Sequence, residues 1–159
     1  MDFRLRTTEL QFRTVFVVSF AGSLLAMSGC GGAPELAPVR GIVEFDGKPI
    51  AGFQNAAVAF TPSGGRPAKG PISLDDGSFE LSTYSSGDGA RIGAHTVAVS
   101  ATVDDPSATA EDKYPGVRSV IPEEFANRDT SGLACEVEPG GNFVRIQIRS
   151  DGTGAIVKE

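Results

Sequence analysis

Apolar and polar residues alternate along much of the chain between residues 39 and 149. A period of two is typical of β-strands that have one buried side and one solvent-facing side. Each alternating run is bounded by residues that favour turns, such as Asp, Gly and Pro. The predicted strands are residues 39–45, 57–60, 72–74, 78–82, 95–100, 133–137 and 143–149.

The alternation also predicts which side chains form the core. Cys135 is in phase with two apolar neighbours, so we expect a buried apolar thiol rather than a reactive one. His95 is expected at an outward position of its strand. In the last strand, Phe143, Arg145, Gln147 and Arg149 are expected to face outward. The predicted inward residues are Val58, Phe60, Phe79, Leu81, Val97, Val99, Leu133, Cys135, Val137, Val144, Ile146 and Ile148.

These strands predict the fold class. Seven short strands separated by turn residues, without a convincing helical period, indicate an all-β, seven-stranded antiparallel β-sandwich. About 110 residues, from 39 to 149, suffice for one such domain without a disulfide. The Asp75-Asp76-Gly77 turn between residues 72–74 and 78–82 is the clearest hairpin. Residues 150–159 show little pattern and are expected to form a tail outside the domain.

The first 30 residues have a different pattern. Arg4, Arg6 and Arg13 precede an uncharged apolar run from Thr14 to Met27. This run is shorter than the roughly 20 residues that a membrane-spanning helix needs. A basic segment followed by a short apolar segment is typical of a secretory signal peptide.

The apolar run ends in Met27-Ser28-Gly29-Cys30, which resembles the lipobox of bacterial lipoproteins. The resemblance implies cleavage after Gly29 and attachment of diacylglycerol to the thiol of Cys30. Residues 1–29 would then be a lipoprotein signal peptide, and residues 30–38 a lipidated cysteine with a flexible tether. The alternative is an ordinary cleaved signal peptide with a cysteine there by chance.

Lipidation at Cys30 predicts an exported protein bound to the membrane of the bacterial cell envelope. Gly31 is not the Asp that retains lipoproteins in the inner membrane of enteric bacteria, which favours the outer membrane. The full chain has a net charge of −6. Removal of the signal peptide makes the charge more negative, because three arginines leave with only Asp2 and Glu9. Such an acidic chain is not expected to bind nucleic acid.

Further motifs of the predicted domain lie at residues 41–43, 46–52, 57–60, 75–79 and 93–97. These motifs resemble the carboxypeptidase regulatory-like domain, whose fold is a transthyretin-like (prealbumin-type) sandwich with an Ig-like Greek key. The segment from Ile121 to Asn142 resembles short lipoproteins of planctomycete-type bacteria. Most such domains are modules without known activity, so the resemblance implies no catalytic residues.

Little in the sequence indicates catalysis. One His and two Cys cannot build a usual four-ligand zinc site, and no cofactor is expected. His95 as a lone general base is the alternative to a structural role, but no nucleophile is marked beside it. Asp75, Asp76, Asp104 and Asp105 lack the spacing of a calcium loop and are expected in turns. We therefore predict that the protein is not an enzyme.

The segment from Ala101 to Gly132 is long for a loop in a compact domain. Tyr114, Ile121 and Phe125 are its candidate binding residues, and packing of Ile121 and Phe125 onto the core is the alternative. The predicted function is a lipid-anchored protein-interaction or assembly module that contacts another envelope protein. A carbohydrate-binding module is the second hypothesis, although the chain has no Trp and only Tyr84 and Tyr114 as tyrosines. A hydrolase is the third.

Overall fold

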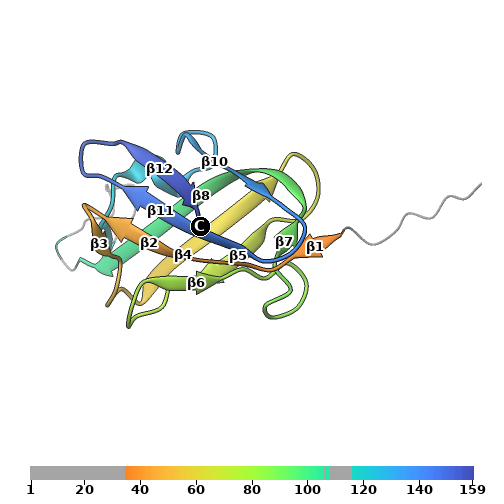
Figure 1. Ribbon diagram of the computed structural model, residues 1–159. Helices are drawn as coiled ribbons and strands as arrows, with labels where there is room; N and C mark the ends of the chain where they lie inside the picture. Colours follow the sequence, from red (N-terminus) through yellow and green to blue (C-terminus); the bar gives the residue numbers. More distant parts are fainter. Residues whose placement is uncertain (1–34, 106, 108–115) are drawn as a thin grey trace, which may run out of the picture. The chain divides into compact units, whose positions relative to one another are not determined.

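The computed structural model describes residues 35–105, 107 and 116–159. In these ranges the protein is all-β, with one short 3-10 helix (Figure 1). No helix of the described ranges is long and apolar enough to cross a membrane. The elements are β1 (Leu36–Ala37), β2 (Val39–Phe45), β3 (Lys48–Pro49), β4 (Asn55–Pro62), β5 (Ala68–Pro71), β6 (Ser78–Glu80), β7 (Ala90–Arg91), β8 (Gly93–Asp104), β9 (Val117–Ser119), η1 (Glu123–Ala126), β10 (Leu133–Val137), β11 (Asn142–Ile148) and β12 (Gly154–Lys158).

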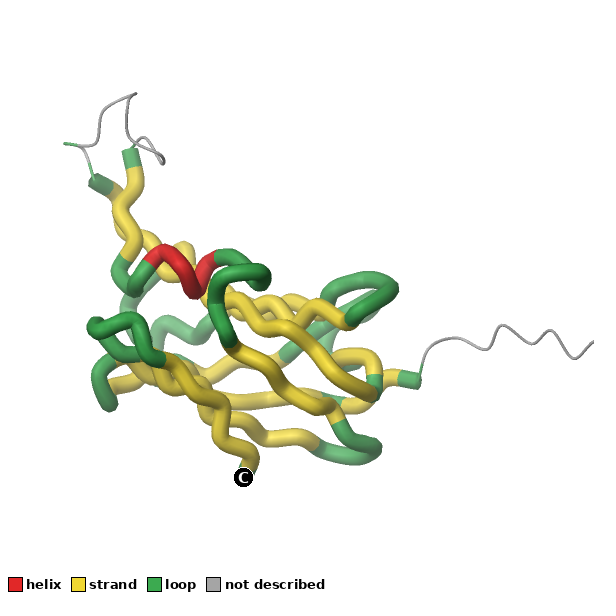
Figure 2. The backbone as a smooth tube through the Cα atoms, turned by 90° about the horizontal axis from the view of Figure 1, so that it is seen from above, coloured by secondary structure: helices red, strands yellow, loops and turns green. Residues whose placement is uncertain are grey.

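Two five-stranded sheets make up most of the domain. The first, here called the β4–β8 sheet, has the order β10-β8-β4-β5, with β9 also paired to β8. The second, the β2–β11 sheet, has the order β12-β11-β2-β3, with β6 also paired to β2. β1 and β7 form a small separate pair. Figure 2 shows that the loops gather at the two ends of this layered structure.

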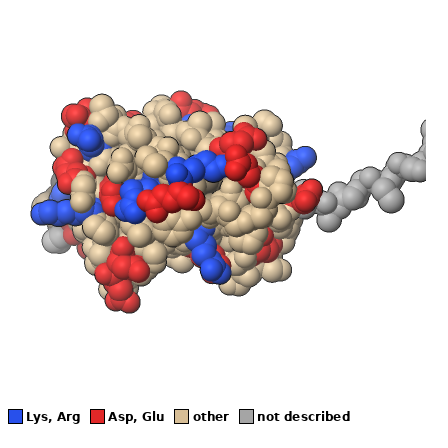
Figure 3. Space-filling view, in the orientation of Figure 1, with Lys and Arg blue, Asp and Glu red and all other residues tan. Residues whose placement is uncertain are grey.

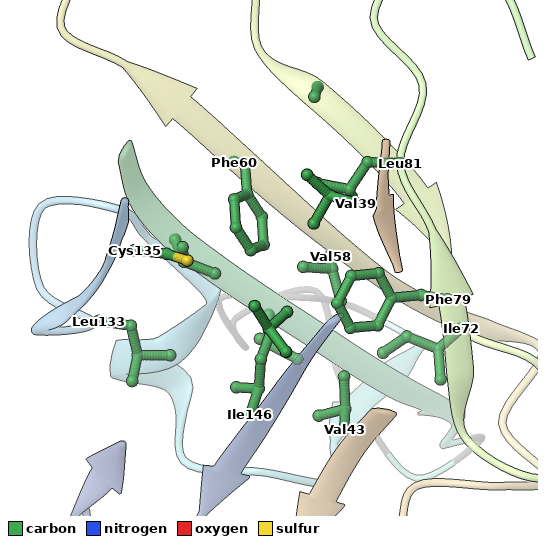
Figure 4. Packing of buried hydrophobic residues seen from close by; sticks show 14 of the residues in the cluster. Val39, Val43, Val58, Phe60, Ile72, Phe79, Leu81, Leu133, Cys135 and Ile146 are labelled. Atoms are coloured by element: carbon green, nitrogen blue, oxygen red, sulfur yellow. The ribbon is translucent and has the colours of Figure 1, made fainter. Parts of the chain in front are cut away.

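The core lies between the two sheets and follows the predicted alternation (Figure 4). All of the side chains predicted to point inward are buried. Phe60 of β4 and Phe79 of β6 bring the sheets into contact, with ring centroids 6.4 Å apart. Burial of each such large side chain contributes about 1.5–3 kcal/mol, which makes this shared core the main source of stability.

The structure corrects the prediction for His95, which is only 3% exposed and faces the core. β8 starts at Gly93, so positions 95, 97 and 99 lie on the same side of one continuous strand. The period of two therefore places the imidazole beside Val97 and Val99, and the prediction of an outward position was wrong. The buried thiol predicted at Cys135 is confirmed, and it lies opposite His95 on β10.

The predicted antiparallel arrangement is wrong for one central pair. β2 and β11 run parallel, from the pair Val39–Asn142 to the pair Phe45–Ile148. All other strand pairs described are antiparallel. Alternation of apolar and polar residues is the same for both directions of pairing, so the sequence pattern could not distinguish them.

The third predicted strand is displaced. Regular pairing occurs at β5, residues 68–71, instead of residues 72–74, and only Ile72 makes an isolated bridge to Phe79. The predicted turn at Asp75-Asp76-Gly77 is present, since Gly77 N donates to Ser73 O at 3.1 Å. The strands on its two sides belong to different sheets, so this turn connects the two layers.

Both ends of the domain extend beyond the predicted limits. Leu36 and Ala37, expected in the flexible tether, pair with β7, and Ala37 is buried. Residues 154–158, expected in a tail, form β12 along the edge of the β2–β11 sheet. The described domain thus includes twelve strand segments instead of seven, several of them only two or three residues long.

Candidate interaction surface

The solvent-facing side of the β2–β11 sheet, here called the outer face, combines charged and apolar side chains. Strand register places Phe143 beside Arg40, and Arg40 beside Glu80. The next row across the sheet has Arg145 between Val157 and Ile42. Figure 3 shows basic and acidic side chains next to each other in a band across this face.

Arg145 is the centre of the charged network on the outer face. Its Nε donates to Glu159 Oε1 at 2.8 Å, and its Nη1 donates to Glu44 Oε1 at 2.5 Å. Gln147 Nε2 also donates to Glu44, at 3.3 Å. The hydrogen bonds to Glu159 and Glu44 raise the pKa of Arg145 above its ordinary value. The network fixes the guanidinium in place, so this part of the face presents a defined arrangement of charges.

A second ion pair crosses the sheet at the other end of the same face. Arg40 donates to Glu80 Oε1 from Nε at 2.8 Å and from Nη2 at 2.7 Å. Both side chains are largely exposed. An exposed pair of this kind adds little stability, and it remains accessible to a partner.

An apolar hollow of about 560 Å³ lies next to the Arg40–Glu80 pair. Leu74 and Phe143 line it and are exposed to 50% and 37%, respectively. Ile72 and Phe79 form part of its wall, where they also contact the core. Large apolar side chains exposed beside fixed charges are typical of protein-binding surfaces.

A smaller hollow of about 280 Å³ lies on the turn side of the outer face. Its lining is mixed: Glu44, Asp46, Gln147 and Arg149 contribute polar groups, and Gly47 and Ile148 complete the wall. Asp46 Oδ1 accepts a hydrogen bond from Ser150 N at 3.0 Å, which connects the turns at the ends of β2 and β11. No group of three or more potential metal ligands occurs among these residues or elsewhere in the described ranges.

Of the three predicted binding residues, the structure describes Ile121 and Phe125 but not Tyr114. Ile121 is buried, and Phe125, at the 3-10 helix, is 1% exposed. The alternative in which both pack onto the core is therefore confirmed, and neither can present its side chain to a ligand. Tyr114 lies outside the described residues, as do the predicted lipidation site Cys30 and the preceding Gly29.

His95 and Cys135 lie opposite each other on β8 and β10, and both are buried. His95 Nδ1 lies 2.9 Å from Gly93 O and must donate to it, which leaves Nε2 as the acceptor nitrogen. This Nε2 has no hydrogen-bond partner among the described residues. Burial lowers the pKa of His95 and raises the pKa of Cys135, so both are held neutral. A neutral thiol away from solvent is a poor nucleophile.

Tyr84 lies on a loop away from both hollows of the outer face. It is 56% exposed, and the Arg66 guanidinium lies 5.7 Å from the centre of its ring. Asp88 organises this loop, since its carboxylate accepts hydrogen bonds from the N–H groups of Thr83, Tyr84 and Ser85. Those bonds, that of Thr83 above all, lower the pKa of Asp88.

Of the aspartates considered for calcium, Asp75 and Asp76 lie in the predicted turn. The prediction of a turn is wrong for Asp104, which ends β8 and pairs with Val117 of β9. Asp76 Oδ1 accepts from Ser78 N at 3.0 Å, and Asp105 Oδ1 accepts from Ser107 N at 3.0 Å. Hydrogen bonds from these serines lower the pKa of both carboxyls. Asp105 also lies near Arg118, with Oδ2 and Nε 3.7 Å apart. Local hydrogen bonds to the backbone thus account for the carboxylates of Asp76 and Asp105.

The alternation of apolar and polar residues does not indicate that the outer face forms a surface of this kind. The position of Phe143 could have indicated a binding surface, because an aromatic residue at an outward position of a strand exposes a large apolar surface. Leu74 follows the core residue Ile72 and precedes a turn, so its position beside Phe143 depends on the tertiary fold. No family model, curated protein or solved structure matches this chain.

Proposed function

We propose that the protein is a lipid-anchored module of the bacterial cell envelope that binds another envelope protein through its outer face. The observation that carries this proposal is the apolar hollow with the exposed Leu74 and Phe143 beside the Arg40–Glu80 pair. An apolar centre surrounded by polar and charged groups is the usual arrangement of a protein-binding site.

The anchoring part of the proposal is supported by the N-terminal sequence. A basic segment, a short apolar run and Met27-Ser28-Gly29-Cys30 favour acylation of Cys30, and Gly31 favours sorting to the outer membrane. For the fold we propose a transthyretin-like sandwich of the carboxypeptidase regulatory-like type. Two sheets around one core support this assignment. A fold of this type must also contain the parallel pair β2–β11.

A protein partner is favoured over a glycan by the chemistry of the exposed residues. Sugar-binding sites generally use exposed aromatic rings for stacking, and this chain has no Trp. One face of the Tyr84 ring is near Arg66, and Tyr84 does not line either hollow of the outer face. Leu74 and Phe143 offer an apolar surface that suits aliphatic or aromatic side chains of a protein.

A binding role is also favoured over hydrolysis. The one histidine is buried against Phe60, with ring centroids 6.0 Å apart. Its neighbour Cys135 is a buried thiol with a raised pKa. Neither group lines a hollow of the outer face, where a substrate could meet it.

Site-specific photo-crosslinking tests the proposed face. A benzophenone amino acid replaces Phe143 in one variant and Ala57 in a matched control, because Ala57 is exposed on β4 of the other sheet. In cells, position 143 is expected to give a discrete crosslinked product that is lost with the additional change Leu74→Asp. Equal products from both positions, or persistence of the product with Leu74→Asp, would contradict the proposal.

A further inference from the structure

The described chain starts at the end of the domain that carries β1, here called the β1 end. Backbone hydrogen bonds attach these first residues to the rest of the domain. Ile92 N donates to Glu35 O at 3.0 Å, and Asn142 N donates to Pro38 O at 2.9 Å. Ala37 is buried, and its carbonyl lies so close to Gly89 that a Cβ there would overlap it. From Glu35 onward the chain is therefore part of the folded domain rather than of a tether.

Chain length then limits how far the β1 end can lie from the proposed anchor. Six residue steps separate Cys30 from Leu36, and these can span at most about 20 Å. β8 has 12 residues, which extend over about 40 Å between the two ends of the domain. The β1 end thus stays close to the bilayer, although the tether alone would also allow the domain to lie on its side.

We propose that the β1 end docks on the lipid headgroups, with the Tyr84 ring in the interface and Arg66 and Arg91 beside lipid phosphates. This inference rests on the proposed acylation of Cys30 and adds an orientation to it. The three residues lie near one another at this end: Arg91 is in β7 and pairs with Leu36 of β1, Tyr84 lies on the loop between β6 and β7, and Arg66 lies on the loop between β4 and β5.

Tyr84 is presented on a rigid support. The Asp88 carboxylate holds the loop through backbone N–H groups, and Thr83 Oγ1 donates to Gly89 O at 2.7 Å. The Tyr84 side chain nevertheless stays 56% exposed. A tyrosine has an apolar ring and a polar hydroxyl, and it prefers the boundary between hydrocarbon and water.

The two arginines connect the loops and present guanidinium groups at the same end. Arg66 lies over the Tyr84 ring, and Arg91 Nη1 donates to Gly64 O at 3.1 Å. A guanidinium binds phosphate oxygens with directed, charge-assisted hydrogen bonds. Both side chains belong to residues with solvent exposure, so their remaining donors can reach a headgroup.

Exposed carboxylates occur at both ends of the domain. At the β1 end Glu35 and Glu136 are exposed, while Glu138 pairs with Lys158 at 3.0 Å. The opposite end exposes the aspartates Asp75, Asp76, Asp104 and Asp151. Anionic headgroups repel both sets of carboxylates. The proposed orientation therefore depends on the short link to Cys30 and on Tyr84, Arg66 and Arg91, and not on a difference in acidic residues.

Tryptophan fluorescence can measure this orientation, because the natural chain contains no Trp. The variants Tyr84→Trp and Leu74→Trp each introduce a single reporter at an exposed position, one at each end. The lipidated full chain is reconstituted in phosphatidylethanolamine–phosphatidylglycerol vesicles with and without brominated lipids. Emission from the indole at position 84 is expected to shift to the blue and to be quenched several-fold more than emission from the indole at position 74.

The arginines are tested in the Tyr84→Trp background. Changing Arg66 and Arg91 to Ser is expected to reduce quenching of the reporter at position 84, whereas Arg149→Ser at the opposite end leaves it unchanged. Equal quenching at positions 84 and 74, or no quenching at position 84 in vesicle-bound protein, would overturn the docking proposal. Loss of the lipid mass or failure to float with the vesicles would instead overturn the anchor itself, so the two failures are distinguishable.

Discussion

The guanidinium of Arg145 and the carboxylate of Glu44 join β11 to β2, two strands from opposite ends of the sequence. Their hydrogen bond of 2.5 Å crosses the parallel pair, and both side chains are only partly exposed. Glu159 accepts a hydrogen bond from Nε of the same guanidinium. Arg145 therefore connects β2, β11 and the residue that follows β12. The outer face of the sheet is thus held together by the same residues that give it its charge pattern.

Glu44→Gln is expected to lower the free energy of unfolding. The change removes a charge partner of Arg145 and leaves an amide at a partly buried position between the strands. Arg40→Gln, which breaks the exposed pair with Glu80, is the matched control and is expected to have a smaller effect. Urea unfolding of both variants measures this, and an equal or larger loss in Arg40→Gln would contradict the structural role of Arg145.

Stability is expected to fall at mildly acidic pH because of His95. Burial lowers its folded pKa below the ordinary value of 6.5, while the hydrogen bond to Gly93 and the charge of Glu136 partly oppose the shift and the charge of Arg91 adds to it. The unfolded chain therefore binds a proton more readily than the folded protein does. The contribution of neutral His95 is complete above the unfolded pKa, near 6.5, and decreases as the pH falls from there toward the folded pKa.

Thermal unfolding between about pH 5 and pH 8, the range in which a histidine titrates, checks this prediction, with His95→Leu as the comparison. Leucine also removes the buried Nε2, which has no hydrogen-bond partner in the described part of the chain, and such an unpaired buried group costs about 1–3 kcal/mol. The variant is expected to lose the part of the pH dependence that lies just below the ordinary histidine pKa. An unchanged pH profile in His95→Leu would show that other groups cause the dependence.

Asn142→Ala is expected to destabilise the domain by about 1–3 kcal/mol, because it leaves buried polar groups without partners. The Asn142 amide accepts from Glu138 N at 3.0 Å, and it donates to Glu138 O at 2.9 Å and to Gly140 O at 3.1 Å. Asn55→Ala, at an exposed position of β4, serves as the control. Chemical denaturation would contradict the assignment if both changes had the same small effect.

Phe125→Ala is expected to cost about 3–5 kcal/mol, as for other large-to-small changes in a core. Phe125 is 1% exposed. Its ring lies so close to residue 154 that only glycine fits there, since a Cβ would lie 2.6 Å from the ring. Gly154→Ala is therefore also expected to destabilise, whereas Gly141→Ala has open space. A near-neutral Phe125→Ala in urea unfolding would indicate that this segment is not part of the core.

The sequence predicted the all-β class and the buried side of each long strand, since alternation directly reports burial. It missed β5, because Ala68-Lys69-Gly70-Pro71 has the composition of a loop. Gly70 is needed there, because a Cβ would overlap the carbonyl oxygen of Glu80 on the neighbouring backbone. β12 was missed because its side chains are mostly exposed and carry no clear alternation. The parallel pair β2–β11 depends on tertiary topology alone.

For the candidate site, the sequence could indicate Phe143 as an exposed aromatic residue, but not its neighbourhood. The apolar hollow forms from residues of β2, β5, β6, β11 and the segment between β5 and β6, which become neighbours only in the folded domain. The error at His95 has a simpler cause. The strand begins two residues before the histidine, and the period of two then fixes the imidazole on the inner side.

Intact mass spectrometry of the membrane-extracted protein, natural and with Cys30→Ser, tests the lipid-anchored account most directly. The account predicts a mature chain that begins at Cys30, carries the mass of diacylglycerol with any further acyl group, and fractionates with membranes. In Cys30→Ser, the lipid mass and the membrane association are both expected to be lost. An unlipidated natural chain in the soluble fraction would contradict the account, and with it the proposed orientation of the β1 end toward the bilayer.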